Sequence, residues 1–186
     1  MKKLYQFLKY EYRSYLKYRS QSLYFSKKSC SIADTVIVKG PYKNFSFQQG
    51  LIIQDYSFIH LGGFDWCQNK GRLTLGKNCI LSPHCVIYAV GPYGIEIGDD
   101  FGAGPGVKIF SSIQDHYKSL NDILFKPVVI GDNVQLGSNV VINAGVTIGN
   151  NVFVGAGSIV LNDIPDNCFA AGIPASIINS FKNDRK

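Results

Sequence analysis

Residues 130–165 read IGDNVQ, LGSNVV, INAGVT, IGNNVF, VGAGSI and VLNDIP, which are six hexapeptides in strict succession. The first position of every unit is aliphatic, and the fifth is Val in four units and Ser158 and Ile164 in the other two. The fourth position is Asn, Gly or Asp, the residue types that most readily accept a positive φ. Buried positions recur every 3.6 residues in an α-helix and every two in a strand, so neither explains this period. A fixed hexapeptide repeat is the sequence signature of a parallel β-helix.

The period extends toward the N-terminus with interruptions. Its first positions are Leu75, Leu81 and Ile87 and, after four additional residues, Ile97, Ala103 and Ile109; the fifth positions are Cys79, Cys85, Phe101, Val107 and Ile113. From Ile109 to Ile130 there are 21 residues, one hexapeptide and 15 more, which predicts a long loop of the kind that is often functional. Ile32 and Val36 indicate a first coil, whereas residues 38–74 follow no frame that we can assign.

The chain of 186 residues is long enough for one domain with a sizeable core. At three hexapeptides per coil we predict an all-β solenoid of about six coils. We expect an N-terminal segment at 1–29, the β-helix domain at 30–180 and a polar tail at 181–186. No stretch of 18 apolar residues is present, and Lys9 and Glu11 interrupt any signal-peptide core, so we expect a cytoplasmic protein.

The N-terminal segment carries the positive charge of the chain. Residues 1–28 hold eight Lys or Arg against one acid, and the remainder holds eleven against twelve. Leu4, Leu8 and Tyr12 lie on one side of a helical projection and Lys9 and Arg13 on another, which predicts an amphipathic helix. Such a helix could cap the open end of the solenoid or contact an anionic membrane surface at the inner face of the membrane. No recognition motif accompanies the basic residues, so nucleic-acid binding is not favoured.

The five cysteines form no C-x-x-C pair and are odd in number. Cys79 and Cys85 occupy inward fifth positions, where a small apolar side chain fits. We therefore predict that both are core residues rather than metal ligands or disulfide partners.

The run from Val128 to Ala175 resembles the C-terminal half of hexapeptide-repeat O-acetyltransferases. The nearest group is the maltose, galactoside and cell-surface polysaccharide acetyltransferases. The resemblance spans about 80 residues from Ile95 and includes the closing motifs D-I-P (163–165) and A-G-x-P-A (171–175). It implies a left-handed β-helix, a homotrimer with active sites between subunits, and transfer of acetyl from acetyl-CoA to a sugar or glycan hydroxyl. The handedness is implied by the family alone, because the usual crossover preference is right-handed.

Acetyl transfer to an alcohol needs a base, and a histidine near its ordinary pKa of about 6.5 is suited to that task. The chain has three histidines. His84 occupies a fourth-position turn and is predicted to be part of the scaffold, while His60 lies in the region without a frame and fits a core or edge residue. His116 lies in the long loop, where the resemblance locates the catalytic histidine; the alternative for a loop histidine is simple solvent exposure. We predict His116 as the general base.

The donor contacts also come from the resemblance. Ser138 corresponds to a position that touches the pantetheine arm of CoA, and Ala156 and Gly157 correspond to backbone positions along the same groove. We also predict that Asn162 contacts the donor, although relatives carry Thr-Lys at positions 161–162. For Ala156 and Gly157 the alternative is that the repeat itself requires small residues there.

Two alternative functions of a β-helix fit this sequence less well. A zinc carbonic anhydrase of this fold uses three histidines, two of them five apart, whereas here the separations are 24 and 32. A non-catalytic or ice-binding solenoid would show regular threonine ladders, and only three Thr are present. A silent scaffold also gives no reason for a long histidine-bearing loop. We therefore predict a metal-independent acetyltransferase that transfers the acetyl group directly, since no Cys or Ser lies in a nucleophile motif.

Overall fold

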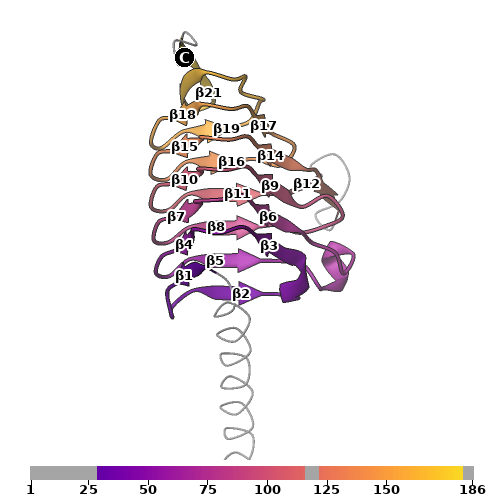
Figure 1. The fold of residues 1–186 in the computed structure, drawn as a ribbon. Helices are drawn as coiled ribbons and strands as arrows, with labels where there is room; N and C mark the ends of the chain where they lie inside the picture. Colours follow the sequence, from indigo (N-terminus) through magenta and orange to yellow (C-terminus); the bar gives the residue numbers. More distant parts are fainter. Residues whose placement is uncertain (1–28, 116–121, 182–186) are drawn as a thin grey trace, which may run out of the picture.

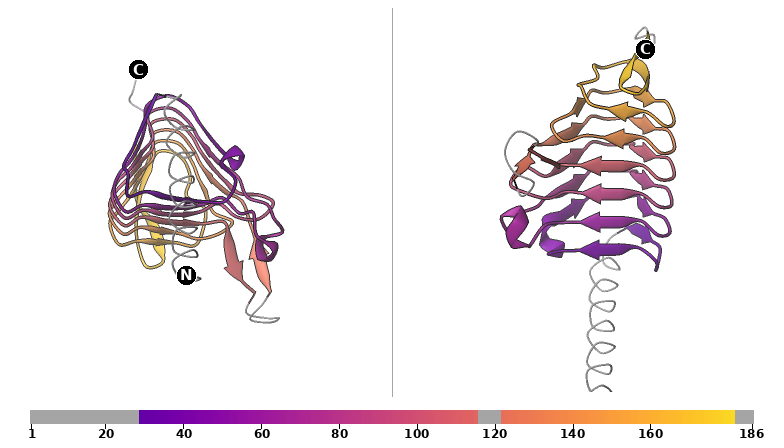
Figure 2. Two further views of the ribbon diagram at one scale, coloured as in Figure 1. Left: turned by 90° about the horizontal axis from the view of Figure 1, so that it is seen from below. Right: turned by 180° about the vertical axis from the view of Figure 1, so that it is seen from behind.

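The computed structural model describes residues 29–115 and 122–181 of the protein. The chain winds into a solenoid that is triangular in cross-section and tapers toward the C-terminal end (Figures 1 and 2). Each coil contributes one short strand to each of three sheets, and neighbouring coils pair in parallel. The predicted all-β parallel solenoid is confirmed, and its arrangement is consistent with a left-handed β-helix. The predicted N-terminal helix lies outside the described residues.

We name the three faces A, B and C in the order in which the chain follows them. Face A contains β1 (Cys30–Ile32), β4 (Leu51–Ile53), β7 (Ile80–Leu81), β10 (Gly102–Ala103), β15 (Gln135–Leu136), β18 (Val152–Val154), β20 (Cys168–Gly172) and β21 (Ala175–Ser180). Face B contains β2 (Ile37–Lys39), β5 (Phe58–His60), β8 (Val86–Tyr88), β11 (Lys108–Phe110), β16 (Val141–Ile142) and β19 (Ile159–Val160). Face C contains β3 (Phe45–Phe47), β6 (Leu73–Leu75), β9 (Ile95–Ile97), β14 (Val128–Ile130) and β17 (Thr147–Ile148).

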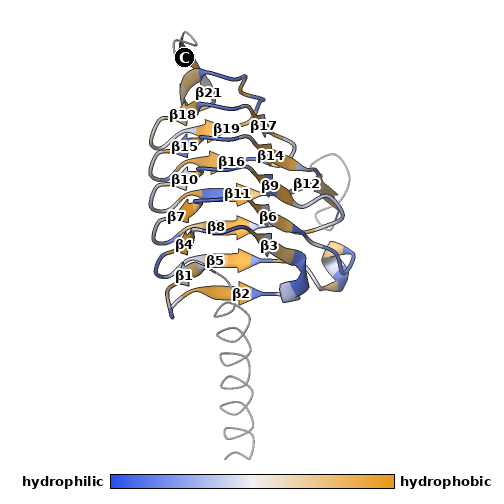
Figure 3. Cartoon of the chain, in the orientation of Figure 1, coloured by the Kyte–Doolittle hydropathy of each residue, from blue (hydrophilic) through white to orange (hydrophobic). Residues whose placement is uncertain are grey.

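The first positions of the repeat stack on one another from coil to coil. Leu81 pairs with Ala103 and Ala103 with Leu136 on face A, and Ile87 pairs with Ile109 on face B. These side chains are buried in the hydrophobic core. The strands that carry them are largely coloured as hydrophobic in Figure 3. A fully buried Ile or Leu contributes roughly 1.5–3 kcal/mol through removal from water, so the stack of inward aliphatic residues holds the coils together.

The side chains at the inward fifth positions of the repeat are also buried, with one exception. Cys79 and Cys85 are fully buried free thiols, as predicted, and burial raises the pKa of each to about 11. Ile113 was expected to point inward, but it is only half-buried and lies outside the core cluster. The chain leaves the coil after β11, and Ile113 belongs to a projecting hairpin.

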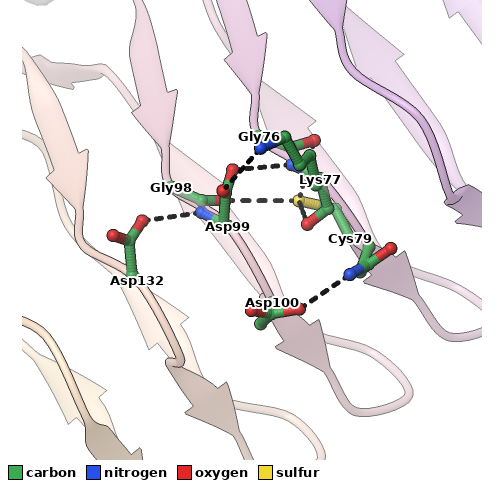
Figure 4. Close-up of polar contacts among 8 residues, drawn as sticks. Gly76, Lys77, Cys79, Gly98, Asp99, Asp100 and Asp132 are labelled. Carbon is green, nitrogen blue, oxygen red and sulfur yellow. Dashed lines mark hydrogen bonds and ion pairs between the residues drawn. The ribbon is translucent and has the colours of Figure 1, made fainter.

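The corner between faces C and A carries a polar ladder. The side chains of Asp99 and Asp132 each accept the backbone N–H of the corresponding residue one coil earlier, Lys77 and Asp99, at 2.8 and 2.7 Å (Figure 4). Asn150 continues the ladder by accepting the N–H of Asp132 at 2.8 Å. These bonds satisfy backbone donors that leave the sheets at the turn, so the corner is rigid and regular.

All interruptions of the repeat fall at one corner, the BC corner (residues 40–44, 61–72, 89–94, 111–127, 143–146 and 161–163), between the strands of faces B and C. Six positions separate Ile142 from Ile148, but nine separate Val38 from Phe47 and sixteen separate Ile59 from Leu75. The extra residues form the 3-10 turns η1 (Tyr42–Asn44) and η2 (Asp65–Cys67) and a hairpin of β12 (Ser112–Gln114) and β13 (Ile123–Phe125), which project from one side of the prism (Figure 2). Residues 38–74 are therefore two ordinary coils with insertions.

Candidate functional site

The β12–β13 hairpin flanks, in the sequence, the segment that contains His116, the residue predicted as the general base. Its strands pair antiparallel, with Ser112 opposite Phe125 and Gln114 opposite Ile123. The backbone N–H of Asp115 donates to the carbonyl oxygen of Asp122 at 2.8 Å and closes the described part of the hairpin. Residues 116–121, including His116, lie outside the described residues. The expected long loop is therefore a hairpin whose described base spans positions 112–115 and 122–125.

The base of the hairpin is held against the solenoid. The hydroxyl of Ser111 donates to the carbonyl oxygens of Tyr88 and Val90, both at 2.8 Å, and accepts the N–H of Val90 at 2.9 Å. The N–H of Lys126 in turn donates to the carbonyl oxygen of Ser111 at 3.0 Å. A Cβ on Gly91 would lie 2.2 Å from the ring of Phe125, so only glycine permits this approach of hairpin and coil. The hairpin thus leaves the coil from a fixed, buried root.

His60 lies on face B next to the η2 insertion and is buried. Its Nδ1 accepts the N–H of Gly62 at 3.1 Å, and its ring is surrounded by Tyr88, Phe64 and Trp66 at centroid distances of 5.2 to 5.6 Å. Burial, and then the charge of Lys39, lowers the pKa of His60 below 6.5. The expected role as a core or edge residue agrees with this packing.

His84 occupies a turn of the AB corner, which we define as residues 33–35, 54–56, 82–84, 104–106, 137–139 and 155–157, between the strands of faces A and B. Its φ is 62°, and its ring stacks on Tyr56 with centroids 5.3 Å apart. The side chain is exposed, and its backbone serves the turn, as expected for a scaffold residue.

Three of the four predicted donor contacts share the AB corner. Gly157 donates its N–H to the carbonyl oxygen of Ser138 at 2.8 Å, so Ser138 and the Ala156–Gly157 turn are stacked on consecutive coils. Ala156 and Gly157 are exposed, and a Cβ built on Gly157 meets nothing within 4 Å. Asn162 is also exposed but lies at the BC corner of the sixth coil, apart from the other three.

The hairpin and the donor residues lie at opposite ends of the face B strands. A three-residue strand spans about 10 Å, so the two groups are separated along this face. Within one chain the described geometry does not bring them together, because the solenoid keeps its corners apart.

A concave surface at the BC corner was missed by sequence reasoning. It encloses about 540 Å³ between the insertions of four consecutive coils, and its lining includes Lys43, Lys70, Arg72 and Tyr93. Three of these residues, Lys43, Lys70 and Arg72, lie within positions 38–74, where no repeat frame was assigned. The jump of sixteen positions from Ile59 to Leu75 was the available signal, because an insertion at a solenoid corner projects from the coil.

Two further properties of the described residues bear on function. Within residues 29–115 and 122–181, no group of three or more His, Cys, Asp or Glu is arranged to hold a metal ion. No helix in the same ranges is long and apolar enough to cross a membrane.

Comparison with known proteins supports the resemblance drawn from the repeat. Residues 127–162 match the family model for the bacterial transferase hexapeptide (six repeats). The galactoside O-acetyltransferase of Escherichia coli (strain K12) is 42% identical over 117 residues, which is 61% of this chain and 56% of that enzyme. This chain therefore spans little more than half the length of that curated relative.

Solved structures share the architecture. A hexapeptide-repeat acetyltransferase from Vibrio cholerae, in complex with acetyl-CoA, is 26% identical with a TM-score of 0.53, over 93% of this chain and 79% of that one. AntD, an N-acyltransferase from Bacillus cereus in complex with dTDP and 3-hydroxybutyryl-CoA, is 22% identical with a TM-score of 0.72, over 83% and 81%. At that identity the likeness to AntD concerns the fold alone. The chain thus carries the hexapeptide repeat in a parallel β-helix, and it is similar in sequence and fold to acetyltransferases of this architecture.

Proposed function

We propose that the protein is an acetyl-CoA-dependent O-acetyltransferase that transfers an acetyl group directly to a hydroxyl of a sugar or glycan precursor. The observation that carries the proposal is the hairpin at the BC corner, which projects from a buried root and leads directly to His116. A solenoid that served only as a scaffold would need no such projection. The 42% identity to a galactoside O-acetyltransferase supports the reaction class and the acceptor class.

The open AB corner supports a bound thioester donor. Beside Gly157 there is room for a pantetheine arm to lie against the backbone, and Ser138 lies one coil away at the same corner. The relative from Vibrio cholerae was solved with acetyl-CoA, which supports the identity of the donor. Small residues suit this corner because any larger side chain at position 157 would occupy the space that the donor needs.

We propose that the active site is completed by a neighbouring subunit of a homotrimer. The hairpin and the Ser138–Gly157 corner lie at opposite ends of face B in one chain, so one subunit must supply the base and another the donor groove. Asn162, at the BC corner, would then serve a donor bound mainly by the adjacent subunit.

In the proposed reaction, His116 removes the proton of the acceptor hydroxyl as its oxygen attacks the thioester carbonyl. The tetrahedral oxyanion is stabilised by N–H donors, and its collapse forms the ester and expels the CoA thiolate. His116 then returns its proton to the thiolate, so the histidine ends neutral as it began. Holding donor and acceptor together supplies the orientation that the reaction requires.

Release of free thiol from acetyl-CoA tests the proposal. The full chain should release thiol in the presence of a hydroxyl acceptor from a panel of sugars and nucleotide-linked sugars, and the acetylated product should carry an ester that mild alkali removes. Amino sugars in the same panel distinguish O-acetyl from N-acyl transfer, because an amide survives mild alkali. No thiol release with any acceptor would refute the proposed activity.

The basic segment 1–28 supports a second, separate proposal that the enzyme works in the cytoplasm at the inner face of the membrane. Eight cationic residues interspersed with aromatic ones suit an anionic lipid surface. Sedimentation with vesicles containing a quarter phosphatidylserine should retain the full chain and lose a variant that lacks residues 1–28. Equal binding of both proteins, or loss of the fold on deletion, would favour the capping role instead.

A further inference from the structure

The concave surface at the BC corner, which we name the basic pocket, is defined by Lys43, Asn69, Lys70, Arg72 and Tyr93. These residues come from the insertions of three consecutive coils and converge on one space of about 540 Å³. Pro127, at the root of the hairpin, contributes to the same lining. The pocket therefore adjoins the element that the proposed reaction uses.

The backbone of the pocket is held rigidly. The carbonyl oxygen of Lys70 accepts the N–H of Gly91 at 2.9 Å, and that of Arg72 accepts the N–H of Ile95 at 2.8 Å. The N–H of Lys70 donates to the carbonyl oxygen of Cys67 at 3.0 Å, and Cys67 is fully buried. The backbone of Lys70 and Arg72 is thus fixed by the fold at the edge of the pocket that these residues line.

The charge of the pocket is largely uncompensated. Among the described residues, no carboxylate lies within 4.0 Å of the ammonium of Lys43 or Lys70. Arg72 makes a hydrogen-bonded ion pair with Glu96 through one guanidinium nitrogen at 2.6 Å, which leaves further N–H donors of that group. Isolated surface lysines need no explanation, but two unpaired lysines and an arginine that line one concavity raise the local positive potential.

The remaining lining suits a sugar. Tyr93, which lines the pocket, is 53% exposed, and its side chain offers an apolar face with a polar tip. The side chain of Asn69 is exposed and donates to Asp65 at 2.9 Å, and its amide keeps further hydrogen-bonding capacity. An aromatic face beside several cations is an arrangement that holds a sugar ring through one contact and an anionic substituent through the others.

We propose that the basic pocket binds an oxyanion, a phosphate or a carboxylate, carried by the sugar acceptor. This inference rests on the proposed acetyltransferase function and extends it from a sugar in general to an anionic sugar. The donor's own phosphates are the competing source of the same chemistry. The acceptor is favoured because the pocket lies in the first four coils, whereas the predicted donor contacts Ser138, Gly157 and Asn162 all belong to the fifth and sixth coils.

Direct binding to the full chain tests the pocket without requiring turnover. Isothermal titration with glucose 1-phosphate, glucuronate and glucose should give binding of at least one anionic sugar and none of glucose. The affinity should fall as salt is raised, because the contacts are between charges. The double substitution Lys43→Gln with Lys70→Gln should weaken that binding by about tenfold or more, the factor expected when charge-assisted contacts are lost.

A matched control removes the same charge elsewhere. Lys77→Gln with Lys108→Gln also deletes two lysines, one at the corner between faces C and A and one on face B. This variant should bind the anionic sugar as the unaltered chain does. Lys43 and Lys70 are exposed, so the test variant should keep its denaturation midpoint. Equal loss in the two double variants would overturn the proposal, because the effect would then be one of net charge.

Coenzyme A and 3′-dephospho-CoA distinguish the two sources of phosphate. If the pocket serves the acceptor, the Lys43/Lys70 variant binds both as the unaltered chain does. Weakened binding of coenzyme A with unchanged binding of the anionic sugar would assign the pocket to the donor and overturn the proposal, as would no binding of either anionic sugar. Absence of thiol release with every acceptor, with anionic-sugar binding intact, would instead refute the acetyltransferase function and leave the pocket as an anion site.

Discussion

Gly62 donates its backbone N–H to Nδ1 of His60 over 3.1 Å, and this bond defines the imidazole as the tautomer that is protonated at Nε2. The ring lies stacked on Tyr88 and is enclosed by the η2 insertion through Phe64 and Trp66. A buried ring whose Nδ1 already accepts a hydrogen bond is not suited to take up a second proton. His60 therefore acts as a packing element that fastens the second-coil insertion to face B.

The folded protein should lose stability as the pH falls below about 7, in part through His60. Its pKa in the folded state is lower than the unfolded value of 6.5, mainly through burial. Below that unfolded value the unfolded chain binds more protons, so the free energy of unfolding falls with falling pH. The contribution of His60 is complete above about pH 7 and is lost as the pH falls through 6.5 toward the folded pKa.

Urea denaturation at a series of pH values between 8 and 5 measures this slope. His60→Asn keeps an acceptor for the N–H of Gly62 but cannot be protonated, so its stability should depend less on pH in that window. His84→Asn, at an exposed turn, is the control and should keep the slope of the unaltered chain. An unchanged slope in His60→Asn would show that other groups cause the pH dependence.

The polar ladder at the corner between faces C and A should be worth a measurable amount of stability at each rung. Asp132→Ala removes the acceptor for the N–H of Asp99 and should lower the free energy of unfolding by about 1 kcal/mol. Asp132→Asn should cost less than half of that, because Asn150 makes the same bond one coil later. Chemical denaturation of the three proteins provides the comparison, and equal losses in both variants would mean that charge, not hydrogen bonding, stabilises the corner.

Two glycines with the same backbone conformation should respond differently to alanine. Gly62 and Gly157 both have φ of 72°, but a Cβ on Gly62 would lie 1.9 Å from the carbonyl oxygen of Lys70 and one on Gly157 would meet nothing within 4 Å. Gly157→Ala should cost about 1 kcal/mol, the penalty of a left-handed residue alone. Gly62→Ala should cost roughly 3 kcal/mol or more, because the η2 insertion must move. Thermal and urea denaturation measure both, and similar losses would contradict the close packing of the insertion.

Gly157→Ala also tests the donor groove. If CoA lies against the backbone at the AB corner, the added methyl group should raise the KM for acetyl-CoA several-fold while the KM for the acceptor stays nearly constant. An unchanged KM for acetyl-CoA would move the donor away from this corner.

His116→Ala should lower kcat by about two orders of magnitude or more, the usual contribution of a general base. The oligomeric state, measured by analytical ultracentrifugation, should not change. His84→Asn serves as the matched control, since it removes a histidine from a scaffold turn and should leave thiol release unaltered. Near-normal turnover in His116→Ala would remove this histidine from the mechanism.

The coils from Leu75 onward could be predicted residue by residue because burial recurs there every six positions. Where the interval was longer, the same rule failed: Ile113 fits the period but lies on the hairpin. Residues 38–74 were left without a frame because two insertions hide Val38, Phe47 and Ile59, which stack like every other first position. A local period cannot identify an insertion whose length is arbitrary.

The candidate site could be predicted only in part, because a local period does not identify insertions of arbitrary length. The loop position and the resemblance pointed to His116, and the resemblance alone to Ser138 and Gly157. Neither indicated that the described base of the hairpin and the Ser138–Gly157 corner occupy opposite ends of one face. For the basic pocket the sequence showed only the long interval from Ile59 to Leu75, and it gave no indication that Lys43, Lys70 and Tyr93, far apart along the chain, line one space.

The sequence alone predicts a three-faced solenoid. Buried aliphatic residues and turn-forming residues recur every six positions, and only in that form does such a pattern satisfy both burial and backbone hydrogen bonding. Where the insertions into the repeat meet is evident only from the tertiary structure. Each coil rises by one strand spacing and returns to the same corner, so insertions separated by 20 or more residues in the chain stack on one another and enclose a common space. That convergence depends on the winding of the whole chain and is encoded in no single segment.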